Sequence, residues 1–99
     1  MDHFQFVFEK RFFFDFEEAY NWYENKEFGR GERLRLDVLN TLEEIHTFPK
    51  FEIRYNEIRC KSLGKFPFMI HFHIDRESNI VFILALISTH KDPNASWLK

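Results

Sequence analysis

The sequence has one cysteine, three glycines and three prolines among its 99 residues. Because Cys60 has no second thiol to pair with, an internal disulfide and a metal site built from several thiolates are both excluded. The glycines are too few and too scattered to form a phosphate-binding loop. We therefore expect a protein without metal or another cofactor, in which Cys60 is a small buried apolar residue.

Long apolar runs are missing as well. No stretch approaches the roughly 20 apolar residues of a membrane span, and the N-terminus lacks the basic start and apolar run of a signal peptide. We therefore expect a cytoplasmic protein without membrane contact. Aromatic residues are abundant instead: fourteen phenylalanines and 44% hydrophobic residues suffice for one core. Residues 1–99 are accordingly expected to form a single domain.

The charge is spread unevenly along the chain, whose formal net charge is -2. Residues 1–50 hold seven Lys or Arg and eleven Asp or Glu, a net of -4, whereas residues 51–99 hold seven and five, a net of +2. A surface that meets phosphate or an acidic protein should therefore come from the second half. The chain as a whole lacks the positive charge typical of a protein that grips RNA.

The first half of the sequence predicts one strand and two helices. Phenylalanines at every second position predict a strand over residues 4–9, and an apolar stripe of helical period predicts a helix over about residues 11–27. The capping-box spacing of Asp15 and Glu18 leaves open a start at Asp15. Glycines at positions 29 and 31 should end this helix, and a second helix should stop before Pro49. The stripe of the second helix is Leu34, Val38, Leu39, Leu42 and Ile45.

Three strand-like runs follow Pro49, at residues 58–63, 68–74 and 80–87. Five residues separate the last two runs, which is hairpin spacing. The last run is apolar without alternation, so we expect it at the centre of the sheet, covered on both faces. The order predicts an α+β fold: a strand, an antiparallel helical hairpin, then a three-stranded antiparallel meander.

One face of this sheet is the best candidate for a site. In residues 68–74, His71 and His73 alternate with the inward set and therefore lie on the opposite face of the sheet. If Ile58 and Cys60 also point inward, Arg59 and Lys61 share the face of the two histidines. Solvation alone would equally put polar residues there. Two other interpretations are weaker, because a zinc site lacks a third ligand and no carboxylate is placed to assist a histidine as general acid or base. The candidate target-binding residues are Arg59, Lys61, Lys65, His71, His73, His90 and Lys91.

Four segments together resemble a known family. They are residues 16–23, the run Phe66-Pro67-Phe68, the apolar strand at residues 80–87, and Asp92-Pro93 followed by Trp97. In these, over nearly its whole length, the chain resembles the RelE/ParE superfamily of toxins, in its ParE-type or plasmid-stabilisation branch. The resemblance implies a toxin of a type II toxin-antitoxin system, a growth-inhibiting action in the cytosol, and a cognate antitoxin that wraps the toxin.

The resemblance leaves the target open. ParE-type members inhibit DNA gyrase by binding, whereas RelE-type members resemble ribosome-dependent mRNA endonucleases that use a strand arginine and C-terminal basic or aromatic residues. Here Pro67 stands in that arginine's place, and no tyrosine follows Tyr55. We therefore favour binding of a protein, with gyrase as the target. A nuclease would use Arg59, Lys61 and His90, and a non-toxic interaction module on the same fold is the third possibility.

Three aromatic residues fall off or at the edge of the helical stripes, namely Phe14, Trp22 and Phe28. They would leave apolar area exposed unless they pack against the first strand or the C-terminal tail. With a cognate antitoxin implied, we expect these three residues to contact it, on the helical hairpin or at an exposed sheet edge.

Overall fold

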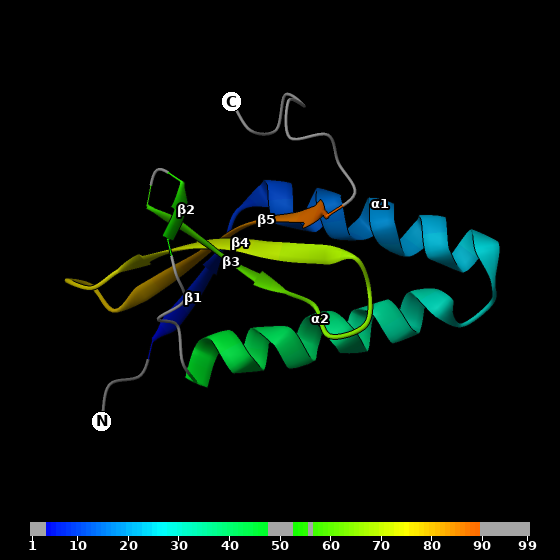
Figure 1. Ribbon diagram of the computed structural model, residues 1–99, viewed down its shortest axis with the longest axis horizontal. Coiled ribbons are helices and arrows are strands. Elements are labelled where there is room, and N and C mark those ends of the chain that lie inside the picture. Colours follow the sequence, from blue (N-terminus) through cyan, green and yellow to red (C-terminus); the bar gives the residue numbers. More distant parts are fainter. Residues whose placement is uncertain (1–3, 48–52, 56, 90–99) are drawn as a thin grey trace.

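Two helices lie against one face of a mixed sheet in this computed structural model, which describes residues 4–47, 53–55 and 57–89 (Figure 1). The predicted α+β class and the helical hairpin are confirmed. The elements in chain order are β1 (Gln5–Phe8), α1 (Lys10–Lys26), α2 (Arg30–Thr47), β2 (Ile53–Tyr55), β3 (Ile58–Ser62), β4 (Phe68–Asp75) and β5 (Ile80–Ser88).

The described strands form one sheet in the order β1-β5-β4-β3-β2. β1 pairs with β5 in parallel, and all other pairs are antiparallel. The predicted meander is confirmed as β3, β4 and β5. As predicted, β5 lies inside the sheet, between β1 and β4, but the helices cover one of its faces and not both. The short strand β2 was not expected, because three residues give too little alternation to be recognised.

The helical hairpin differs from the prediction in two details. α1 begins at Lys10, so the alternative start at Asp15 is wrong. Gly31 does not end α1, because it is the second residue of α2. A Cβ atom at this position would lie only 3.0 Å from the Tyr20 ring. Only Gly29, with φ of +88°, adopts the left-handed conformation that joins the helices. Gly31 thus serves close helix packing.

The core fills the space between the helices and the sheet. The inward phenylalanines of β1 pack against it as predicted, whereas the α2 stripe is only partly correct: Leu39 is 46% exposed, and Asp37 and Thr41 are buried instead. Both polar residues have hydrogen-bond partners, so burial costs them little. The fully buried large residues of the cluster are Leu34, Ile45, Ile70, Phe72, Val81 and Ile83.

Neither α1 nor α2 is long and apolar enough to cross a membrane; this holds for the part of the chain that the structure describes.

Candidate protein-binding surface

A groove of about 470 Å³ lies between α1 and the C-terminal part of β5. Its volume is that of a pocket that takes a small molecule or a few side chains. Its rim carries charged residues of α1, namely Arg11, Asp15 and Glu18. Its apolar walls are formed by Ala19, Trp22, Tyr23, Phe68, Leu86 and Ile87.

The groove exists because β1 is much shorter than β5. The parallel pairing ends at Phe8 and Ile83, so that, among the described strands, none flanks residues 84–88 of β5 on that side. α1 crosses there instead. The carboxylate of Asp15 accepts the backbone N–H of Leu86, with 3.0 Å between Oδ2 and N, and thereby takes the place of a neighbouring strand.

Asp15 is a partly buried carboxylate in this groove. Desolvation by burial raises the pKa of its carboxyl group, while the Leu86 N–H and the Arg11 guanidinium lower it and the Glu18 carboxylate raises it further. Arg11 Nε lies 3.4 Å from Asp15 Oδ2, and the Asp15 side chain is 21% exposed. The sequence offered only the capping-box spacing for Asp15, and its partner Leu86 is too distant in sequence to be inferred.

The far wall of the groove is aromatic. The Tyr23 ring stands edge-on to Phe66, with 4.9 Å between ring centroids, and to Phe68 at 6.2 Å. The Trp22 ring packs edge-on against the Tyr23 ring, with 5.0 Å between ring centroids, and the Trp22 residue is 55% exposed. Aromatic walls of this kind favour an apolar side chain as the occupant.

A buried carboxylate on α2 holds the loop that carries this wall. Asp37, 6% exposed, accepts the backbone N–H groups of Gly64, Lys65 and Phe66 at 3.1, 2.8 and 2.9 Å. Successive backbone N–H groups of this kind form a concave anion-binding site, which here a side chain of the same molecule fills. Asp37 therefore positions residues 64–66.

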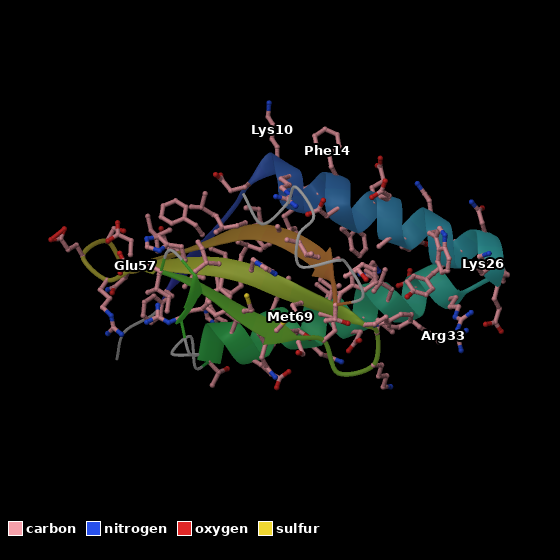
Figure 2. The ribbon with its side chains drawn as sticks, turned by 45° about the horizontal axis from the view of Figure 1, so that its top comes forward. Lys10, Phe14, Lys26, Arg33, Glu57 and Met69 are labelled. Atoms are coloured by element: carbon pink, nitrogen blue, oxygen red, sulfur yellow. The ribbon has the colours of Figure 1, made fainter. Side chains whose placement is uncertain are left out.

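The three aromatic residues proposed from the sequence to bind an antitoxin lie in different places. Trp22 lines the groove. Phe14 is 70% exposed on α1 and points away from the sheet (Figure 2), and Phe28 is 94% exposed in the turn between the helices. The structure therefore does not gather them into one patch.

The predicted grouping of basic residues with the histidines is wrong. Residues paired across neighbouring strands share a face, and Arg59 pairs with Phe72 while Lys61 pairs with Ile70, both of which face the helices. Lys61 Nζ accordingly lies 3.8 Å from Glu44 Oε2 of α2. At the margin of the sheet, long side chains can lay their apolar stems on the core and keep their charges at its rim.

Cys60 occupies the opposite face, where it pairs with His71. Cys60 is buried, as expected, but toward the face without helices. His71 is only 3% exposed and hence no surface residue, whereas His73 stacks on Phe82 with 6.3 Å between ring centroids. Within the described residues, no group of three potential metal ligands occurs.

Of the remaining candidates, the structure places only Lys65. Lys65 lies in the loop held by Asp37, and His90 and Lys91 lie outside the described residues. By register, the side chains that β1, β3, β4 and β5 turn away from the helices include no Lys or Arg. In these four strands, this face of the sheet is therefore apolar and neutral to acidic rather than basic.

Neither a protein-family model nor a curated protein sequence matches the chain. Solved structures do: a chain of the chromosomal ParDE TA system from P. aeruginosa superposes with a TM-score of 0.73 at 14% identity, covering 89% of this chain and 98% of that one. The isolated E. coli RelE toxin superposes with a TM-score of 0.54 at 12% identity, covering 92% of this chain and 88% of that one. A chain of the intact E. coli RelBE toxin-antitoxin complex superposes with a TM-score of 0.55 at 13% identity, covering 91% of this chain and 100% of that one. This chain therefore has the fold of the RelE/ParE superfamily toxins.

Proposed function

We propose that this protein is the toxin of a type II toxin-antitoxin pair, which inhibits growth by binding a protein target and is neutralised by a cognate antitoxin. The observation that carries the proposal is the agreement in fold with a chain of the P. aeruginosa ParDE system, along 89% of this chain and 98% of that one. The agreement with the E. coli RelE toxin is weaker, with a TM-score of 0.54. We therefore propose DNA gyrase as the target, which the ParE-type resemblance implies.

The placement of the basic residues supports binding of a protein over cleavage of RNA. A nuclease needs cations at the phosphate that it cleaves, and RNA binding draws most of its affinity from such contacts. Arg59 and Lys61, which a nuclease would use, lie on the helix side of the sheet, and Lys61 is paired with Glu44. In β1, β3, β4 and β5, the register turns neither Lys nor Arg to the opposite face.

The groove along α1 is the surface that we propose for the antitoxin. Its apolar walls fit an aliphatic or aromatic side chain of an amphipathic segment, and the carboxylates of Asp15 and Glu18 at its rim fit a basic residue beside that side chain. Trp22, half-exposed at one wall, would contact such a segment directly. Phe14 points away from the sheet and lies outside this groove, so its contact with the antitoxin would need a second surface.

Induced expression in E. coli, with and without the product of the neighbouring gene, tests the proposal. We expect growth arrest, loss of negative supercoiling in a reporter plasmid, intact mRNA, and recovery when the neighbouring gene is co-expressed. Arrest with mRNA cut on ribosomes would favour the nuclease instead. A chain that folds but leaves growth and supercoiling unchanged in several hosts would be a non-toxic interaction module and would refute the proposal.

A further inference from the structure

One row of side chains is almost inaccessible to solvent on the helix-free face, the face of the sheet that α1 and α2 do not cover. His71 of β4 pairs with Cys60 of β3 on one side and with Ala85 of β5 on the other, so the three side chains share this face. They are 3%, 8% and 3% exposed, in that order. The helices pack on the opposite face, against Ile70 and Phe72. The helices therefore do not account for the burial of this row.

The described neighbours of the His71 ring are not able to cover it. Side chains stand roughly perpendicular to a sheet, so a long side chain is shielded by long neighbours or from above. The two cross-strand neighbours of His71 end in a thiol and a methyl group, which are short. Along β4, Met69 flanks the ring on one side only, and His73 stacks on Phe82 instead, with 6.3 Å between ring centroids. A further segment must therefore lie over this row.

The burial on this face is deepest toward the C-terminal end of β5. Ile87, two residues beyond Ala85 and on the same face, is 5% exposed. In the other direction His73 and Phe82 are only partly buried, and Val7, which pairs with Phe82, is 39% exposed. The cover therefore lies over the half of the face where β5 ends.

Most parts of the chain outside the described residues are badly placed to reach this half. Residues 1–3 precede β1, whose pairing with β5 begins at Ile80, five residues or about 17 Å from Ala85. Three residues span at most about 11 Å. Residues 48–52 and 56 adjoin β2, which β3 and β4 separate from Ala85.

Residues 90–99, in contrast, begin beside the covered half. They follow Thr89, whose N–H donates to the carbonyl of Pro67 at 2.9 Å and so keeps the chain at this end of the sheet. Ala85 lies four residues back along β5, about 14 Å away, whereas ten residues can span about 33 Å. Their length is therefore more than sufficient to return over the row.

We propose that residues 90–99 fold back over the helix-free face and cover the row around His71. Trp97 and Leu98 supply the apolar surface that such a contact buries. The segment also brings His90 and Lys91 to a face on which β1, β3, β4 and β5 place neither Lys nor Arg. A partner that approaches this side of the sheet meets the segment first. The inference concerns the isolated chain and goes beyond the proposed toxin activity, on which it does not depend.

Cys60 reports on the cover, because it is the only thiol of the chain and thiol reactivity requires access. The test treats three folded full-length chains with Ellman's reagent: wild type, the double variant Trp97→Ser with Leu98→Ser, and the matched control Trp22→Ser, which removes a tryptophan of the α1 groove. We expect Cys60 to react about tenfold faster or more in the double variant, and at the wild-type rate in the control. Equal rates in all three chains would refute the proposal.

A nitroxide label locates the segment independently, and it decides the matter where melting curves show that the double variant does not fold. The label is attached to Ser96→Cys in a full-length chain that carries Cys60→Ala, and the same chain with the label reduced is the control. We expect the amide signals of His71 and Ile87 to broaden more than that of Ile80, at the other end of β5. Broadening confined to the helices, or equal along β5, would overturn the proposal. Protection of Cys60 that is lost on dilution would assign the cover to a second copy of the chain and would overturn it as well.

Discussion

Asp15 Oδ2 lies 3.0 Å from the backbone nitrogen of Leu86 and holds α1 to the central strand at the point where β1 has ended. One carboxylate oxygen thus both satisfies a strand N–H and meets Arg11 at 3.4 Å. All three residues line the groove that we propose for the antitoxin. It also makes the stability of the fold depend on the charge of Asp15.

Asp15 should make the fold less stable as the pH rises from acid to neutral. Burial raises the pKa of its carboxyl group above the ordinary 3.8, so the folded chain binds this proton more tightly than the unfolded chain does. The stability that the bound proton contributes is fully present below 3.8 and is lost as the pH passes the raised value. The free energy of unfolding of wild type, minus that of Asp15→Asn, should fall between about pH 3 and about pH 7.

Urea unfolding of both chains at several pH values measures this difference, and the comparison cancels the titration of the other carboxylates. Asparagine keeps an oxygen that can accept the Leu86 N–H, so only the charge changes. A difference that stays constant or rises with pH would contradict the prediction.

Replacing Asp37 by alanine should destabilise the fold by about 2 kcal/mol or more, because it leaves three backbone N–H groups of the loop at residues 64–66 without their acceptor. Thermal and urea unfolding measure the loss. Glu43→Ala, at an exposed position of the same helix, is the control and should change stability by less than about 0.5 kcal/mol. Equal effects of the two substitutions would show that the loop does not depend on Asp37.

Trp22→Ala should weaken binding of the antitoxin by about tenfold or more, since the ring forms a wall of the groove and is 55% exposed. Inhibition of the target should not change. Calorimetric titration with the product of the neighbouring gene measures the affinity. Leu36→Ala removes an apolar side chain of similar exposure from α2 and should leave the affinity unchanged; weakening by both variants alike would place the antitoxin elsewhere on the hairpin.

Replacing both Arg59 and Lys61 by alanine should leave growth arrest intact, because both side chains lie on the helix side of the sheet. The ion pair of Lys61 with Glu44 is partly exposed, so its loss should cost about 0 to 1 kcal/mol. Growth curves and plasmid supercoiling are the measurements. Loss of arrest together with loss of mRNA cleavage would restore the nuclease interpretation of these two residues.

Local patterns sufficed for most of the fold. The alternating phenylalanines of β1 and the helical stripe through Phe12 and Ala19 each predict their element and its buried side, because the period of a pattern reflects local geometry. The continuous apolar run of β5 predicts the strand but not which of its faces the helices cover. The exposure of Phe14 and Trp22 could be predicted for the same reason.

The site could not be predicted, since it depends on how elements meet. In β3 the alternation favours burial of Ile58 and Cys60 on the helix side. The pairing of Cys60 with His71 shows that this set faces away from the helices instead, and no local pattern reveals that pairing. The bonds of Asp15 to Leu86 and of Asp37 to the loop join distant segments, which no local period encodes. The exposure of Phe28, by contrast, was expected from its place off the helical stripes, and the side chain is 94% exposed.

The parallel pairing of the first strand with the last has a consequence for synthesis. Gln5 pairs with Ile80 and Phe8 with Ile83, so the aromatic strand emerges from the ribosome first and has no strand to pair with until β5 has been made. Contacts so distant in sequence form late and slow down folding. The sheet is therefore completed after translation of β5, and an unfinished chain has neither the groove along α1 nor its central strand.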